Sequence, residues 1–157
     1  MKILLPVDGS PLSLEAVRHA LRLRAEGLDA NYVLANVQEP PSLYEVVVAH
    51  DAEVLSELRR AAGADLLAPA EALLEAAGAS WESEVAGGEP GHVLVDLAEN
   101  YGCDAVVMGV GAGNPGPVAL ALVAHSPVPV TLVREPPGAE APAAEGDEPS
   151  VADELPA

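Results

Sequence analysis

The stretch that most constrains the fold of this chain runs from Asp104 to Val133. It begins with an apolar run that ends at Gly109, passes through a loop of glycine, asparagine and proline, continues as a short helix-like segment and closes with a second apolar run. A strand, a helix and a second strand in this order make a βαβ unit, whose two strands are parallel. In an open α/β sheet, a phosphate-bearing ligand binds at the loop that leaves the carboxyl end of a strand. The stretch predicts an α/β fold with a candidate ligand loop at residues 110–116.

The residues before this unit repeat the alternation of strand and helix. Apolar runs predict strands at residues 3–7 and 32–37, and an alternation of apolar and polar residues predicts a third strand at residues 80–85. Apolar residues at helical spacing predict helices within residues 11–27, 51–77 and 91–101. Residues 42–50 fit either a strand or a helix. Five strands that alternate with helices predict a doubly wound parallel sheet with helices on both faces.

Several single residues refine this prediction. Ser10 and Pro11 are residues that commonly precede and begin a helix. Gly63 and Pro69 are expected to bend or break the helix that contains them. The single cysteine, Cys103, lies beside an apolar strand and is expected to be an inert core thiol. The aromatic side chains are also expected in the core, and they are Tyr32, Tyr44, Trp81 and Tyr101.

Charge divides the chain into two parts. Residues 135–157 hold seven acids and no base among proline, alanine and glycine, and they show no apolar periodicity. Such a composition cannot bury enough apolar surface to order a chain. We therefore expect one α/β domain over residues 1–134 and a disordered, acidic tail over residues 135–157. The tail is expected either to keep the protein in solution or to dock a basic partner.

The overall charge also excludes classes of function. The chain carries a net charge of −18, and residues 1–134 retain about −11 of it, so the surface repels the phosphate backbone of nucleic acids. No apolar run approaches the roughly 20 residues of a membrane span, and the first residues do not resemble a signal peptide, so we expect a cytoplasmic protein that binds no membrane. No Ser/His/Asp arrangement is recognisable, so no enzyme activity is predicted. The single cysteine and the scattered histidines predict no metal site, the histidines being His19, His50, His92 and His125.

Five short motifs together resemble the universal stress protein family. They are residues 3–11 (ILLPVDGSP), 35–37 (ANV), 88–90 (GEP), 104–109 (DAVVMG) and 125–130 (HSPVPV). The resemblance covers residues 1–134 and implies a five-stranded parallel sheet in the order 3-2-1-4-5. It also implies a homodimer that pairs the last strands of two copies, with interface residues Val128, Val130, Leu132 and Val133. This pairing would cover an apolar sheet edge, which otherwise promotes aggregation.

The resemblance further implies a nucleotide site, because one branch of the family binds ATP. The positions that match its contacts are Pro6, Asp8, Val37, Met108, Gly109, Gly111, Gly113, Gly116 and Val118. The loop departs from the family pattern, since only six residues separate Gly109 from Gly116 and the usual loop arginine is missing. Ala112 stands where a glycine is usual, and Pro117 has neither the hydroxyl nor the N–H that would bind a phosphate. The resemblance thus implies a non-catalytic, regulatory stress-response homodimer with weak or absent ATP binding; the alternative is an ATP-binding regulator that uses ATP with Mg²⁺.

Two other interpretations of these residues remain open. Asp8 either contacts a ligand, as a sugar-binding or Mg²⁺-binding carboxylate would, or only forms the turn before the next helix. Residues 111–116 also spell the dinucleotide-binding pattern G-x-G-x-x-G, with Glu135 about one strand later. That pattern normally lies in the first strand–helix turn, whereas here it lies in the fourth. The backbone amides of the loop can still bind an anion.

Overall fold

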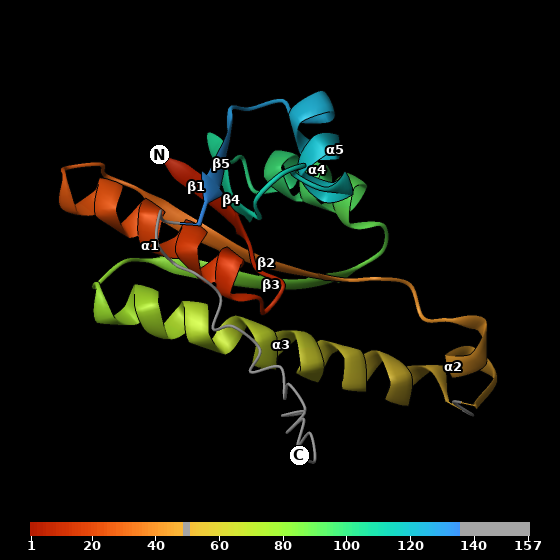
Figure 1. Cartoon of the computed structure of the whole chain (residues 1–157). Coiled ribbons are helices and arrows are strands. Elements are labelled where there is room, and N and C mark those ends of the chain that lie inside the picture. Colours follow the sequence, from red (N-terminus) through yellow and green to blue (C-terminus); the bar gives the residue numbers. More distant parts are fainter. Residues whose placement is uncertain (49–50, 136–157) are drawn as a thin grey trace, which may run out of the picture.

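The computed structural model describes residues 1–48 and 51–135 and contains one sheet of five parallel strands (Figure 1). The strands are β1 (Lys2–Pro6), β2 (Asn31–Gln38), β3 (Trp81–Gly87), β4 (Ala105–Val110) and β5 (Val130–Arg134). The helices are α1 (Pro11–Ala25), α2 (Leu43–Val48), α3 (Ala52–Ala76), α4 (Pro90–Asn100) and α5 (Pro117–His125). The strand order is β3-β2-β1-β4-β5, which confirms the predicted fold class and order.

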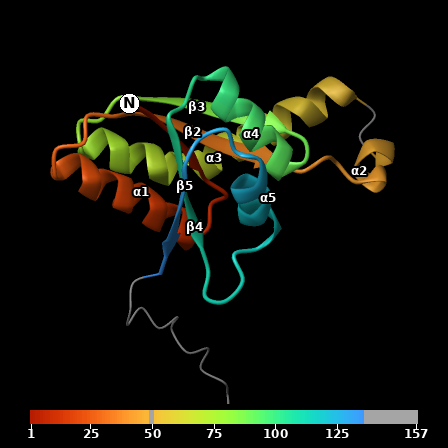
Figure 2. The same cartoon turned by 90° about the horizontal axis from the view of Figure 1, so that it is seen from above.

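Side chains of the strands alternate between two apolar layers, one on each face of the sheet. In β1, Ile3 and Leu5 belong to the layer that contains α1 and α3, whereas Leu4 belongs to the layer that contains α4 and α5. Figure 2 shows α1 and α3 side by side, and Figure 1 shows α4 and α5 on the opposite side of the sheet from α3. Because both faces are covered, β1 and the middle of β2 are buried almost without interruption.

Helix α1 begins where the sequence predicts. The hydroxyl Oγ of Ser10 accepts a hydrogen bond from the backbone N–H of Ser13 at 3.3 Å, and Pro11 is the first helical residue. Ser10 therefore satisfies one of the N–H groups that the first turn of a helix leaves without a partner. This cap fixes the point at which the chain turns from β1 into α1.

Helix α3 differs from the prediction, because neither Gly63 nor Pro69 interrupts it. Gly63 is buried against the sheet, where a Cβ would collide with Val85 and lie 2.9 Å from Oδ1 of Asn36. The glycine thus lets α3 pack closely on β2 and β3, and the helix continues through it. Pro69 lies on the exposed side, and packing of the buried residues on either side of it keeps the helix continuous.

Residues 42–50, which fitted either a strand or a helix, are helical as far as Val48. Helix α2 projects from the body of the fold at the end of α3 that is far from β5 (Figures 1 and 2). Tyr44 lies on this helix with 76% of its surface exposed, so its predicted place in the core is wrong. The aromatic prediction fails there because α2 buries none of its side chains.

The other core predictions depend on the sheet itself. Tyr32 is buried in β2, and its hydroxyl donates to the carbonyl of Ala20 at 3.4 Å. Trp81 and Tyr101 are partly buried, and Cys103 is buried as predicted, where burial raises the pKa of its thiol. The proposed acidic tail, apart from Glu135, lies outside the described residues. None of the described helices combines the length and the apolar character needed to cross a bilayer.

Candidate functional site

The candidate site lies between β1 and β4, where the order in which strands are added to the sheet reverses. From β1 the chain adds β2 and β3 on one side, and from β4 it adds β5 on the other, so the loops after β1 and β4 separate there. Ligands of open α/β sheets bind at this switch point. A cavity of about 210 Å³ opens there, and its lining residues are Pro6, Val7, Asp8, Ser10, Ser13, Ala35, Val37, Glu39, Pro90, Leu94, Met108, Gly109 and Val118.

Six of the nine residues predicted to contact a nucleotide line this one cavity. They are Pro6, Asp8, Val37, Met108, Gly109 and Val118. They come from the ends of β1, β2 and β4 and from the first turn of α5, so four separate segments meet. The three loop glycines, which are Gly111, Gly113 and Gly116, are not among its lining residues.

Asp8 contributes a carboxylate that is already held in place. Its Oδ1 accepts a hydrogen bond from the backbone N–H of Ser10 at 2.8 Å, which is the turn-forming interaction considered for this residue. Burial alone would raise the pKa of the Asp8 carboxyl, but hydrogen bonds from Ser10 and Ser13 outweigh this effect and hold the pKa below its usual value. The side chain is therefore a fixed negative charge at neutral pH, directed by its own turn.

Glu39 is a second acid at this cavity, and the sequence analysis did not identify it. It follows the end of β2, at the same carboxyl edge of the sheet as Asp8. No lysine, arginine or histidine of the described residues lines the cavity. The signal that could have found Glu39 is its position two residues after Val37, because neighbouring parallel strands end at the same edge.

Gly109 is required by the backbone of α1 whether or not a ligand binds. A Cβ at this position would collide with the carbonyl group of Leu12 and lie 3.2 Å from the backbone nitrogen of Ser13. The first turn of α1 therefore lies directly against the end of β4. The close approach explains a glycine here through packing alone.

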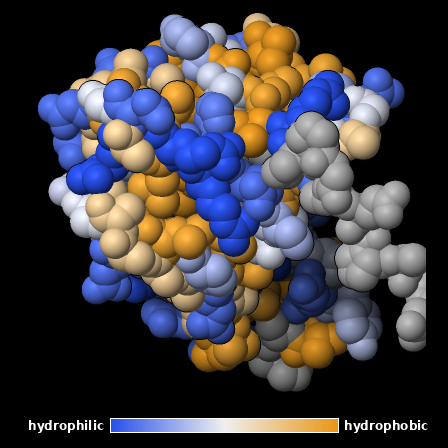
Figure 3. Space-filling model, turned by 60° about the vertical axis from the view of Figure 1, so that its left-hand side comes forward, coloured by the Kyte–Doolittle hydropathy of each residue, from blue (hydrophilic) through white to orange (hydrophobic). Residues whose placement is uncertain are grey.

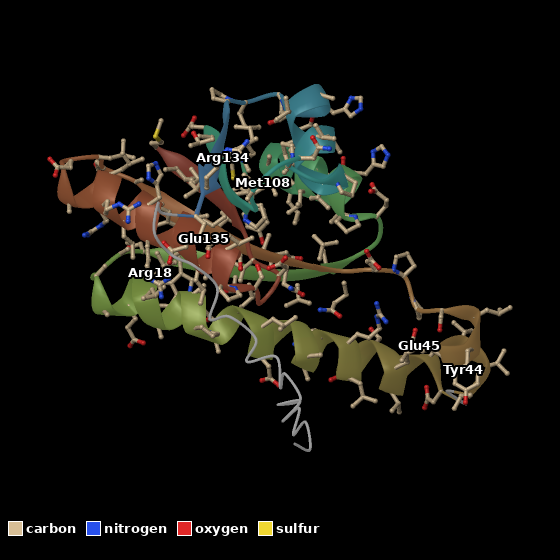
Figure 4. All side chains as sticks on the ribbon, viewed as in Figure 1. Arg18, Tyr44, Glu45, Met108, Arg134 and Glu135 are labelled. Carbon is tan, nitrogen blue, oxygen red and sulfur yellow. The ribbon has the colours of Figure 1, made fainter. Side chains whose placement is uncertain are left out.

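The loop between β4 and α5 is held from outside the cavity. Arg134, the last residue of β5, donates hydrogen bonds from its guanidinium to the carbonyl oxygens of Gly111 at 3.2 Å and Gly113 at 3.4 Å. Figure 4 labels Arg134 and, on the neighbouring strand β4, Met108. Arg134 therefore holds the loop by its backbone carbonyl groups, from a strand that follows the loop in the sequence. Only the β4–β5 register, which pairs Val110 with Arg134, reveals this.

Helix α5 presents an incomplete N-terminus to the cavity. Gly116 is its cap residue, with a φ of 88° and no side chain to accept a hydrogen bond, and Pro117 occupies the first helical position. Proline has no backbone N–H, so the first turn has one donor fewer than usual. The loop matches the sequence of the dinucleotide-binding pattern, but none of its three glycines lines the cavity.

The four residues predicted at a dimer interface lie in or beside β5. Val130 and Leu132 are half-buried on the face that packs against α4 and α5, as is Val128 just before the strand, and Val133 is buried on the other face. Strand β5 pairs with β4 on one side and ends the sheet on the other. In the part of the chain that the structure describes, no three His, Cys, Asp or Glu side chains gather as a metal site would require.

The sheet and its cavity define a doubly wound α/β protein of the kind that receives small ligands at the carboxyl ends of its strands. A model of the universal stress protein family matches residues 1–134. The chain belongs to this family. It is 29% identical over 141 residues to the universal stress protein MJ0531 of Methanocaldococcus jannaschii, in an alignment that covers 86% of this chain and 82% of the relative.

Solved structures share the same fold. A protein of the universal stress protein family from Burkholderia pseudomallei has a TM-score of 0.67 at 25% identity, with 84% of this chain and 94% of that chain covered. A universal stress protein in complex with cAMP has a TM-score of 0.63 at 25% identity, with 85% and 96% covered. The hypothetical protein MJ0577 has a TM-score of 0.70 at 22% identity, with 87% and 96% covered, and supports the fold alone.

Proposed function

We propose that this protein is a non-catalytic regulator of the stress response that acts as a homodimer and binds ATP weakly or not at all. The observation that carries the proposal is the charge and size of the cavity at the switch point. Its volume of about 210 Å³ is smaller than the ~300 Å³ at which small-molecule pockets usually begin. Asp8 and Glu39 would face an incoming triphosphate, and the described lining residues offer no basic side chain to offset them.

The loop after β4 supports the same proposal. Only six residues separate Gly109 from Gly116, and Pro117 removes a backbone donor at the start of α5. A hydrogen bond to a charged group contributes about 1.5–3 kcal/mol. Losing the hydroxyl and the N–H that a serine would offer at this position therefore weakens phosphate binding by about two to four orders of magnitude.

Calorimetric titration with Mg²⁺-ATP tests the proposal directly. We expect no saturable binding, and a low-micromolar dissociation constant would contradict it. The Pro117→Ser variant restores both missing donors at the start of α5 and is expected to bind ATP more tightly than the unchanged protein. Pro115→Ser relaxes the loop without placing a donor at the helix start, so it is the matched control and is expected to change nothing.

The homodimer is proposed to form through β5. Within the described residues the sheet ends at this strand, whose side chains Val130 and Leu132 are only partly covered. Figure 3 shows hydrophobic residues at several places on this side of the molecule, at the top of the view and lower down. An apolar sheet edge of this kind is stabilised when a second copy pairs with it.

A nucleotide-binding regulator is the second candidate, favoured by the meeting of six predicted residues at one cavity. The structure of a relative in complex with cAMP shows that a protein with this fold accommodates a nucleotide. In this case ATP or a smaller adenine nucleotide would contact Asp8, Val37 and the loop amides. Replacing Asp8→Ala should then abolish binding of labelled nucleotide, and unchanged binding would exclude this site.

A further inference from the structure

A second cavity lies at the opposite end of the sheet from β5, between α2, α3 and the ends of β2 and β3. It has a volume of about 410 Å³, within the ~300–1,000 Å³ typical of small-molecule pockets. We name it the α2–α3 cavity. Its lining residues are Gln38, Pro41, Val46, Ala52, Leu55, Ser56, Arg59, Arg60, Val85, Ala86 and Gly87.

The charge of this cavity is opposite to that of the protein. The chain has a net charge of −18, yet the only charged side chains among the described residues that line the cavity are Arg59 and Arg60. Arg59 approaches Glu45 of α2 at 4.0 Å, and Arg60 forms no ion pair with the described residues. The other described bases do not line it. The α2–α3 cavity is therefore an apolar hollow with a basic rim.

The surface around the cavity is unusually apolar for an exposed region. On α2, Leu43 and Val47 are 80% and 68% exposed, and on α3 Leu58 is 64% exposed. Figure 4 shows Tyr44, of the first turn of α2, at the outer edge of the molecule. A contiguous apolar surface with a polar rim usually marks a contact site.

The sequence contains a segment that matches this surface in charge and in apolar content. Residues 136–157 hold six acids and no base. Val151 and Leu155 are their only side chains larger than proline among the apolar residues, and Asp153 and Glu154 lie between them. A spacing of four residues places two side chains on one side of a helical turn, which is how amphipathic segments anchor in grooves.

The geometry of the sheet brings this segment within reach. All strands are parallel, so β5, which leads into residues 136–157, ends at the same edge as β2 and β3. Four strand spacings separate β5 from β3, or about 19 Å at ~4.8 Å per strand. Val151 lies sixteen positions after Glu135, which allows an extended reach of about 53 Å.

We propose that residues 149–156 of the same chain dock in the α2–α3 cavity. Val151 and Leu155 fill the apolar hollow, and Glu154, three residues after Val151, contacts Arg59 and Arg60. The acidic segment then covers the exposed surface of α2 and α3 and competes with any other partner of that surface. This contact is independent of whether the cavity at the switch point binds a nucleotide.

Paramagnetic relaxation in the full chain tests this contact. A nitroxide on Ala157→Cys, in a Cys103→Ala background, is expected to reduce the amide signals of Leu55, Ser56, Val85 and Ala86, while signals from α5 keep their intensity. Replacing Val151→Asp and Leu155→Asp should restore the lost signals. The matched control replaces Ala143→Asp and Ala144→Asp, which adds the same charge to the same segment without touching the anchors, and should leave the signal loss in place.

The contribution of charge is measured in the same experiment. Arg59→Gln with Arg60→Gln should partly restore the signals, and high salt should act in the same direction. Signal loss that is spread evenly over the fold, or that persists after the anchor substitutions, would overturn the proposal. Loss that appears only when labelled and isotope-enriched chains are mixed would assign the cavity to a neighbouring copy and would also overturn it.

Discussion

Gly109 is the residue at which an added methyl group disturbs the most backbone. In Gly109→Ala the new Cβ meets the carbonyl group of Leu12, which cannot move without shifting the start of α1. We expect a loss of about 1–3 kcal/mol in the free energy of unfolding, the usual cost of overpacking, measured by urea denaturation. Gly111→Ala is the matched control, because its Cβ would make only an ordinary contact of 3.7 Å with the side chain of Leu12. Equal effects of the two substitutions would contradict the packing account.

Asp8 links the candidate site to the pH dependence of stability. Its folded-state pKa is lowered by the hydrogen bonds from Ser10 and Ser13, which outweigh its burial. The charged carboxylate therefore stabilises the fold above the ordinary pKa of about 3.9, and this contribution is lost as the pH falls through the lower folded-state value. Asp8→Asn should thus destabilise the protein more at neutral pH than at acidic pH.

Thermal unfolding over a range of pH measures this difference. Asp96→Asn, at an exposed position of α4, is the control and should show a small effect of constant size. A difference between the protein and Asp8→Asn that does not change with pH would show that the carboxylate is not held by its turn.

Periodicity identified a residue of the candidate site only where that residue follows a strand directly, as Asp8 does. Val37 and the other predicted residues of the cavity came from the family resemblance. Glu39 was missed because its role depends on how β2 lies beside β1. Arg134 was missed because its contact with the loop at Gly111 joins residues 23 positions apart. Such contacts depend on the register of strands, which local periodicity does not specify.

At the scale of an element, substitutions in α3 distinguish the effect of helix propensity from the effect of packing. Gly63→Ala and Pro69→Ala both favour an isolated helix, by about 1 and 3 kcal/mol respectively. In the fold, Pro69 is exposed and Gly63 is buried against Val85 and Asn36. We therefore expect Pro69→Ala to raise the free energy of unfolding and Gly63→Ala to lower it. Chemical denaturation checks both signs, and stabilisation by Gly63→Ala would contradict the packing described for α3.

The elements themselves followed from the sequence more completely than their internal details. Four of the five strands appeared as apolar runs because they are largely buried, whereas β3 appeared through its alternation of apolar and polar residues. The break expected in α3 did not occur, since propensity is outweighed by the packing of Leu67, Ala70 and Leu74 on the sheet. Residues 43–48 could not be assigned, because their three consecutive valines favour a strand while their place beside α3 favours a helix.

At the scale of the whole molecule, alternation of strands and helices predicted the fold class, but not the order of the strands. The order 3-2-1-4-5 came from the family resemblance, and the structure confirms it. Topological rules leave several orders open, because a chain can add its next strand on either side of the sheet. The change of side between β3 and β4 is what creates the switch point and its cavity.

The proposed homodimer makes a prediction at this scale. Val130→Lys with Leu132→Lys places two charges at the β5 edge and is expected to reduce the mass measured by light scattering from that of a dimer to that of a monomer. The matched control is Leu120→Lys with Val123→Lys, which adds the same charge on the exposed side of α5. The control is expected to remain a dimer. Circular dichroism verifies that both variants fold, and a dimer that survives the β5 substitutions would exclude this interface.

Arg134 ends the outermost strand and also holds the carbonyl oxygens of Gly111 and Gly113. One side chain thus belongs both to the rim where copies are proposed to meet and to the turn above the small pocket. If dimerisation changes the affinity of this loop for a ligand, thermodynamic linkage requires that the ligand change the dimerisation constant by the same factor. Ligand binding would then have to be measured at several protein concentrations, and dimerisation at several ligand concentrations.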